Sequence, residues 1–249
     1  MWLIMLGKYR GFLFDLDGTL MAGRRALPGA AELMRALDGR FVVVSNDSEH
    51  IPEQLAGVMR GAGLPIGEDR LILSGIASLD FLERSWPGAR LHLIGSVALA
   101  RDAERRGFLL TDSGADIVLI ARDRNFTYET LAAAARNVHD GANVVVASPD
   151  RSHPGIDGYP VPEAGALAAA ILSIGERREP IVVGKPEPTL FRMACAKLDL
   201  DPCDCLMIGD NPLTDGEGAA RSGMTFLHVA PGDLPALAVH PDLEMFKRG

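Results

Sequence analysis

The chain has 249 residues, of which 47% are hydrophobic and 23% charged, a composition that fits a globular protein and excludes a disordered or fibrous one. Its formal net charge of −8 and its lack of a lysine- or arginine-rich run argue against a nucleic-acid partner. The apolar opening, Met1–Leu6, lacks a basic leading segment and is too short to span a membrane. We therefore expect an added strand or packed tail there, no membrane partner and a cytoplasmic location.

Short apolar runs alternate with Ala-, Leu- and Arg-rich segments along the chain. The runs are almost unbroken, which is typical of strands buried on both faces of a parallel sheet. Several intervening segments begin at Pro or a hydroxyl residue and end at Gly, as helices do. The fold class is therefore α/β. In chain order we expect strand Phe12–Phe14, helix Gly29–Leu37, strand Phe41–Val44, helix Pro52–Met59, strand Leu71–Leu73, helix Ala77–Arg84, strand Leu91–Ile94, helix Ala98–Arg106, strand Ile117–Ile120, helix Thr127–Val138, strand Val144–Ala147, helix Gly165–Leu172, strand Ile181–Val183, helix Thr189–Leu198, strand Leu206–Ile208 and strand Thr225–Val229.

Four of the apolar runs end directly on polar residues, at Asp15, Ser45, Lys185 and Asp210. In an open α/β sheet, ligands bind outside the carboxyl ends of the strands. We therefore expect these four strand ends to share one crevice, and the residues that follow them are the candidates for a functional site.

The stretch between Ser45 and Lys185 is far longer than one helical crossover requires. It also contains its own alternation of strands and helices. We predict a second α/β domain at residues 75–180, inserted into a core made of residues 1–74 and 181–249.

Asp15 and Asp17 are two carboxylates that follow the first strand and precede a glycine. Asp-Gly is also a common turn, so the pair alone is weak evidence. Phosphoryl transfer, however, needs such a pair. One carboxylate can attack phosphorus to give an aspartyl-phosphate, and a second can protonate the leaving group and later activate water. Oxygen ligands of this kind suit Mg²⁺.

The other three clusters supply what remains of a phosphoryl site. Ser45 and Asn46 can donate to phosphate oxygens, although small polar residues here also cap helices. Lys185 precedes a proline but lacks the sequence of a Walker A loop, and the simplest alternative is a solvated lysine. Asp210 and Asp215 add two acids suited to a hard cation. The order of acid pair, hydroxyl, lysine and acid pair favours phosphoryl transfer.

With these motifs in this order, the chain resembles the haloacid-dehalogenase-like (HAD) phosphatases over nearly its whole length. The resemblance implies a Rossmann-like, doubly wound parallel-sheet core with an inserted α/β cap domain. An insertion between the second and third motifs is similar to subclass IIA, which includes p-nitrophenyl-phosphatase-like, pyridoxal-phosphate and phosphoglycolate phosphatases and bacterial nucleotide phosphatases. That subgroup often dimerises through the cap, so the resemblance also allows a homodimer.

The resemblance implies a role for each acid. Asp15 would be the nucleophile and a Mg²⁺ ligand. Asp17 would be the acid/base and would also bind Mg²⁺ through its backbone carbonyl. Asp210 would be a further ligand, and Asp215 would support metal-bound water.

The resemblance likewise implies that Ser45 and Asn46 hold the phosphoryl oxygens and that Lys185 neutralises charge between nucleophile and phosphate. The segment from Ala147 to Leu167 resembles the cap's substrate-facing loop and following helix, in which His153 could contact substrate. The alternative for His153 is an ordinary exposed loop histidine.

Two departures from the family pattern bear on substrate choice. Asp47 stands where the family usually carries Asn, and Glu49 where the pyridoxal-phosphate enzymes show Arg. Both add negative charge, which costs binding of a dianionic substrate unless a metal or base offsets it. Arg24 and Arg25 follow the first motif and could touch an anionic substrate, but solvent is the usual environment of loop arginines.

The hypothesis that follows is a Mg²⁺-dependent phosphatase that hydrolyses a small phosphorylated metabolite through an aspartyl-phosphate. A phosphotransferase or phosphomutase could use the same core motifs. The short stretch between Thr19 and Phe41 has no room for the helical cap that such mutases usually carry there. A non-catalytic phosphate-binding module is the third possibility, but it would have no evident need to keep both Asp15 and Asp17.

Overall fold

The computed structural model describes residues 6–37, 39–155, 158–174 and 179–243. The chain divides into two compact units, which we call the core unit and the inserted unit. The core unit comprises Met1–Ser45, Pro52–Ile72 and Lys185–Gly249, and the inserted unit comprises Asn46–Ile51 and Leu73–Gly184. Of the predicted tail Met1–Leu6, residues 1–5 lie outside the described part, and Leu6 begins a short 3₁₀ turn, Leu6–Lys8.

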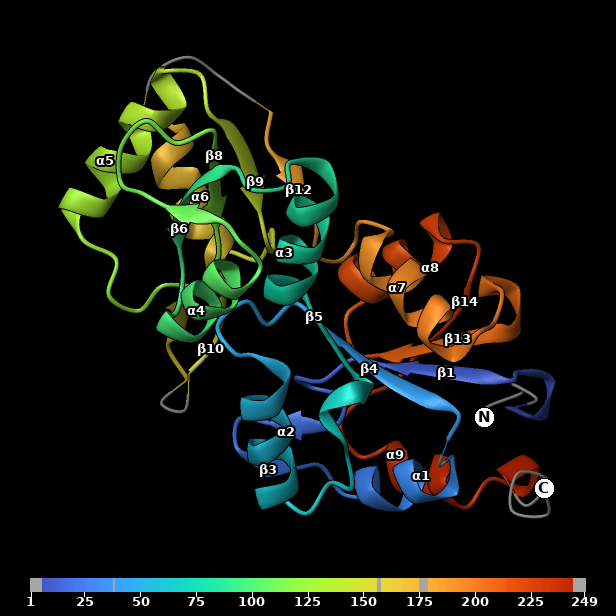
Figure 1. Ribbon diagram of the computed structural model, residues 1–249. Coiled ribbons are helices and arrows are strands. Elements are labelled where there is room, and N and C mark those ends of the chain that lie inside the picture. Colours follow the sequence, from blue (N-terminus) through green and yellow to red (C-terminus); the bar gives the residue numbers. More distant parts are fainter. Residues whose placement is uncertain (1–5, 38, 156–157, 175–178, 244–249) are drawn as a thin grey trace. The chain divides into compact units, whose positions relative to one another are not determined.

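The core unit is built on a five-stranded sheet with β1 in the middle (Figure 1). β1 pairs in parallel with β13 and with β4, and β13 pairs in parallel with β14. All four residues of β1 are buried, as expected for a central strand. The order is β14-β13-β1-β4-β5, and the bounds are Gly11–Phe14 for β1, Phe41–Ser45 for β4, Leu71–Leu73 for β5, Cys205–Gly209 for β13 and Thr225–His228 for β14.

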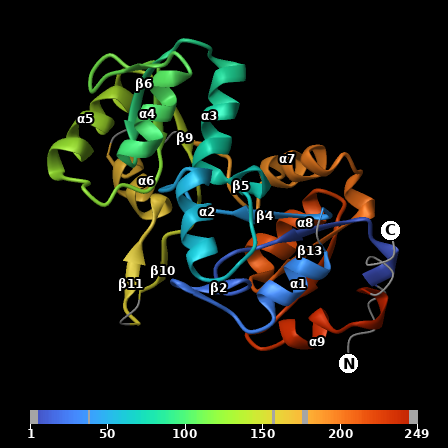
Figure 2. The same cartoon turned by 60° about the horizontal axis from the view of Figure 1, so that its bottom comes forward.

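Helices cover both faces of this sheet. Figure 1 shows α7 and α8 on one face and α1 and α9 on the other, and Figure 2 again shows α1 beside α9. Between β1 and α1 lies a small hairpin whose turn exposes Arg24 and Arg25. The bounds are Ala30–Ala36 for α1, Pro52–Gly61 for α2, Thr189–Leu198 for α7, Glu217–Arg221 for α8, Leu234–Ala238 for α9, Met21–Ala22 for β2 and Arg25–Ala26 for β3.

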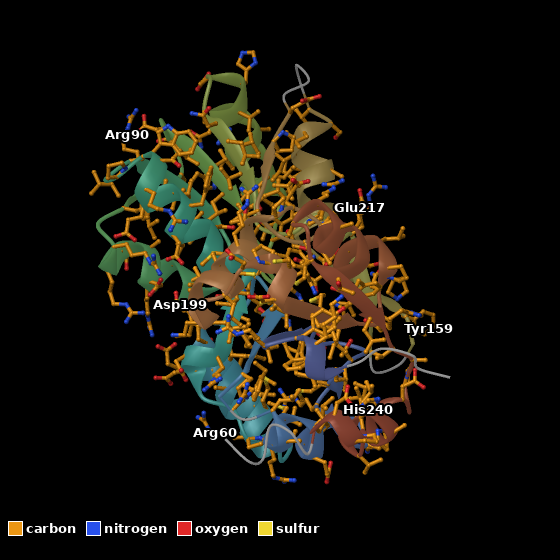
Figure 3. All side chains as sticks on the ribbon, turned by 90° about the vertical axis from the view of Figure 1, so that its right-hand side faces the viewer. Arg60, Arg90, Tyr159, Asp199, Glu217 and His240 are labelled. Carbon is orange, nitrogen blue, oxygen red and sulfur yellow. The ribbon has the colours of Figure 1, made fainter. Side chains whose placement is uncertain are left out.

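The inserted unit has a second parallel sheet, with the order β12-β9-β8-β6-β7. α5 and α6 pack together over β8, and their apolar side chains close the core of this unit. Beside the β10–β11 hairpin, Tyr159 is 73% exposed and lies at the surface (Figure 3). The bounds are Ser74–Ser85 for α3, Arg90–Ile94 for β6, Val97–Arg105 for α4, Leu109–Leu110 for β7, Ile117–Ile120 for β8, Tyr128–His139 for α5, Asn143–Val146 for β9, Ser152–Pro154 for β10, Pro160–Pro162 for β11, Ala164–Leu172 for α6 and Ile181–Val182 for β12.

The predicted class, an α/β fold with a Rossmann-like parallel sheet, is confirmed. The predicted bounds 75–180 differ from the inserted unit, which starts at Leu73, runs to Gly184 and so contains β12, and also includes an earlier segment. The segment Asn46–Ile51 belongs to the inserted unit, although the predicted boundary at residue 75 leaves it in the core. The reason is hydrogen bonding to the start of α3, since Ser74 Oγ donates to the carbonyl oxygen of Asn46 (2.8 Å) and Gly75 N–H donates to that of Asp47 (3.2 Å). Among the described residues, no helix is both long and apolar enough to cross a membrane.

Candidate active site

A buried lysine links two buried carboxylates in the core unit. Lys185 Nζ donates to Asp15 Oδ1 (2.5 Å) and to Asp215 Oδ1 (2.7 Å). Burial would lower the pKa of Lys185, but the charges of Asp15 and Asp215 outweigh it and raise that pKa above its ordinary value. Lys185 is buried and bonded to two carboxylates, so the alternative of a solvated lysine is wrong.

Asp15 is positioned by the continuation of β1 beyond its last residue. Its backbone N–H donates to the carbonyl oxygen of Ile208 in β13 (2.9 Å), and its Oδ2 accepts from Thr19 Oγ1 (3.3 Å). The tight turn that follows depends on Gly18, which has φ +86°, and a methyl group there would lie 2.6 Å from Asp210 Cγ. Glycine at position 18 thus lets the turn that follows Asp15 come close to Asp210.

The segment from Asp210 to Asp215 folds back on the end of β13. Asp215 Oδ2 accepts from the backbone N–H of Asn211 (3.2 Å), and the Asn211 side chain accepts from Leu213 N–H (3.0 Å). A methyl group on Gly209 would lie 2.6 Å from Asp215 Cγ. Asp215 is therefore enclosed by its own turn and by the strand, with its carboxylate directed at Lys185.

Three carboxylates are close enough to hold one metal ion. Carboxylate oxygens of Asp15, Asp210 and Asp215 all lie within 4.8 Å of one another. Burial and the charge of Asp15 raise the pKa of Asp210, and burial raises that of Asp215 to about 6 although Lys185 opposes the rise. Three acids facing one ammonium group form an excess of negative charge, and their all-oxygen donor set suits Mg²⁺.

Asp17 follows β1 and Ser45 ends the neighbouring strand β4, and neither belongs to the group of three carboxylates. Asp17 is exposed and its backbone makes a bridge with Met21, so its side chain stands outside the carboxylate group. Ser45 is the last residue of β4, which neighbours β1, and it is buried.

Asn46 and His153 belong to the inserted unit. Asn46 Nδ2 donates to Asp150 Oδ2 (2.9 Å). His153 lies on β10, with Nδ1 2.7 Å from Glu163 Oε1. Arg122 Nη1 also contacts that oxygen, at 3.1 Å. Burial raises the pKa of Glu163 to about 7 in spite of the Arg122 charge.

The two acidic departures from the family pattern are matched by nearby cations. Asp47 Oδ2 lies 2.7 Å from His50 Nδ1. Burial would raise the pKa of Asp47, but its hydrogen bond with His50 and the charge of His50 lower it, and the same bond raises the pKa of His50. Glu49 pairs with Arg122 (3.2 Å) and Arg124 (3.7 Å). The added negative charge thus has basic partners within the inserted unit, His50 from the same segment and Arg122 and Arg124 from beyond β8.

Four residues that the sequence analysis did not predict as site residues contact predicted ones or the Glu49 carboxylate: Thr19, Arg122, Asp150 and Glu163. Thr19 and Asp150 stand inside the segments that carry the family resemblance, so their position was a usable signal. Glu163 also lies inside such a segment, but Arg122 does not, and their ion pair cannot be read from spacing along one chain.

Comparison with known proteins places the chain in a family. A model of the haloacid dehalogenase-like hydrolases matches residues 9–223. Acid sugar phosphatase of Staphylococcus saprophyticus is 31% identical over 229 residues, which cover 90% of this chain and 88% of that protein. The 5'-nucleotidase YutF of Bacillus subtilis is 29% identical over 227 residues, with 90% and 88% covered.

Solved structures agree with this placement. NagD from Escherichia coli K-12 has a TM-score of 0.82 at 28% identity, covering 94% of this chain and 93% of that one. The 4-nitrophenylphosphatase of Thermotoga maritima has a TM-score of 0.86 at 26% identity, covering 99% and 92%. The chain therefore belongs to the haloacid dehalogenase-like hydrolases, with relatives of subclass IIA, and its enzymatic class is that of the phosphoric monoester hydrolases.

Proposed function

We propose that the protein is a Mg²⁺-dependent phosphatase that hydrolyses small phosphomonoesters through an aspartyl-phosphate on Asp15. The observation that carries this proposal is the buried Lys185 bonded to both Asp15 and Asp215. A lysine in this position holds the Asp15 carboxylate in one orientation and adds a fixed positive charge beside it. Fixed charges of this kind stabilise the oxygens of a transferring phosphoryl group.

The carboxylates of Asp15 and Asp210 and the backbone carbonyl of Asp17 would hold the metal. When bound, Mg²⁺ supplies the positive charge that screens a phosphoryl dianion from the surrounding carboxylates. Asp215 already accepts hydrogen bonds from Lys185 and from the Asn211 amide. Those bonds favour a supporting role for Asp215 over direct ligation.

Two successive displacements account for hydrolysis. An oxygen of Asp15 attacks phosphorus and the bond to the leaving oxygen breaks, while Asp17 gives that oxygen a proton. Asp17 then takes a proton from water, whose oxygen attacks phosphorus and breaks the bond to Asp15. Inorganic phosphate and the original carboxylate result. Ser45 and Asn46 would donate to the phosphoryl oxygens throughout.

The substrate class follows from the relatives and from the insertion. The relatives are named as an acid sugar phosphatase, a 5'-nucleotidase and a 4-nitrophenylphosphatase. We propose a small phosphorylated metabolite, with the inserted unit acting as a cap that excludes water and with His153 near the leaving group. A homodimer through this cap is part of the same proposal. The described residues between β1 and β4 form the β2–β3 hairpin and α1 and no further helix, which argues against the helical cap of the mutases.

The test is p-nitrophenyl phosphate hydrolysis with and without Mg²⁺. We expect turnover that needs Mg²⁺, and a loss of roughly a thousandfold or more in kcat for Asp15→Asn, since that change removes the nucleophile. Asp69→Asn, at an exposed aspartate of the core unit, is the matched control and should stay fully active. Full activity of Asp15→Asn would disprove the mechanism. A wild-type protein that releases no phosphate from a broad panel of phosphoesters would disprove the function.

A further inference from the structure

Asn46 is held by a carboxylate of the inserted unit. Its Nδ2 donates a hydrogen bond of 2.9 Å to Asp150 Oδ2, although the two residues lie far apart in the sequence. Because the acceptor is a carboxylate, this bond is roughly twice as strong as one between neutral groups. Asp150 therefore fixes the rotamer of Asn46 and the direction of its amide.

The other end of the Asn46 amide faces the backbone of Gly184. A methyl group on Gly184 would lie 2.6 Å from Asn46 Oδ1 and also 2.6 Å from the carbonyl oxygen of Ala147, so glycine is needed at this position. The Asn46 backbone is fixed as well, since its carbonyl oxygen accepts from Ser74 Oγ (2.8 Å). The amide is thus confined from two directions, and Asp150 provides its charged contact.

Asp150 is itself well anchored. Its backbone N–H donates to Ser148 Oγ (3.2 Å), and its carbonyl oxygen accepts from Gly165 N–H at the start of α6 (2.9 Å). A methyl group on Gly165 would lie 2.6 Å from that carbonyl oxygen. The end of β9 and the first turn of α6 therefore set the position of the Asp150 carboxylate.

We propose that Asp150 is a positioning residue for phosphoryl transfer, which holds Asn46 in the orientation that donates to a phosphoryl oxygen. This inference rests on the proposed function, which assigns Asn46 to that group. An amide nitrogen carries two hydrogens. Asp150 accepts one of them, and this bond sets the direction of the amide group that the proposed function assigns to the phosphoryl oxygens. Without the carboxylate the amide must be ordered when substrate binds, which weakens binding and slows the reaction.

The experiment compares Asp150→Ala with Asp150→Asn, which keeps the shape and an oxygen acceptor. Substrates are p-nitrophenyl phosphate and glycerol 2-phosphate, and inorganic phosphate serves as an inhibitor without a leaving group. We expect Asp150→Ala to lower kcat/KM roughly tenfold to a hundredfold, equally for both substrates. It should also weaken phosphate inhibition, while Asp150→Asn recovers most of the activity. Asp140→Ala, at an exposed aspartate after α5, is the control that keeps wild-type activity.

A double-variant cycle separates positioning from other roles. In an Asn46→Ala background, Asp150→Ala should cause almost no further loss, because its effect passes through Asn46. If Asp150→Ala lowered activity as much in that background as in the wild-type protein, the proposal would be overturned. Losses that differ between the two substrates would also overturn it, because they would mean direct contact of Asp150 with the leaving group. If the wild-type protein were active and Asp150→Ala had the same activity, the positioning role would be disproved and the proposed function would stand. An inactive wild type would remove the proposed function and this role together.

Discussion

Gly209→Ala should disable the site although it adds only one methyl group. That group would lie 2.6 Å from Cγ of Asp215 and 2.9 Å from its Cβ, and Asp215 is fully buried. The carboxylate must therefore move away from Lys185 and from the Asn211 amide, or β13 must shift. Overpacking of this kind costs about 1–3 kcal/mol of stability. A displacement of about 1 Å at the site costs about a hundredfold in kcat/KM.

Gly57→Ala is the matched control, since Gly57 is exposed in α2 and a methyl group there meets no atom of the described chain within 4 Å. It should stabilise the protein by up to about 1 kcal/mol, because alanine is the better helix former. The assays are urea unfolding and p-nitrophenyl phosphate hydrolysis in Mg²⁺ buffer. If Gly209→Ala matched Gly57→Ala in both, the placement of Asp215 against β13 would be refuted.

Two further predictions concern buried charges. Lys185→Met should cost about 3–5 kcal/mol at neutral pH, because Asp15 and Asp215 would be left without their cation, and it should abolish turnover. Urea unfolding checks this, and wild-type stability would contradict it. Burial raises the pKa of Glu163 in the folded protein to about 7, above its ordinary value of 4.5, so this group makes stability fall as pH rises between those values. The free energy of unfolding falls by at most about 3 kcal/mol, and screening by solvent makes the fall smaller. Glu163→Gln should remove that slope in unfolding measured from pH 5 to 8, and an unchanged slope would show that Glu163 does not cause it.

The regular elements could be predicted because their signals are local. Each of the nine predicted strands is present, since a buried parallel strand must be apolar at nearly every position. The β2–β3 and β10–β11 hairpins were not predicted. Their strands have only two or three residues, too few to show an alternating pattern, and Pro154, Pro160 and Pro162 argue against strand in the second hairpin.

The predicted catalytic residues follow strand ends, and the order of strands in the sheet largely determines which of these ends lie together. Asp15 and Asp210 meet because they follow β1 and β13, which are parallel neighbours, and Asp215 lies in the turn after β13. The charge balance of the inserted unit could not be derived in the same way. The effect of Glu49 depends on Arg122 and Arg124, whose distance from it in space is fixed only by the completed fold.

Two motifs are divided between the units, and this division has a mechanical consequence. Ser45 belongs to the core unit and Asn46 to the inserted unit, while Gly184 belongs to the inserted unit and Lys185 to the core unit. Consecutive Cα atoms are held 3.8 Å apart, so each junction keeps its motif residues together whatever the units do. Any rotation between the units would be taken up by backbone torsions at these two junctions and at the two others, Ile51–Pro52 and Ile72–Leu73.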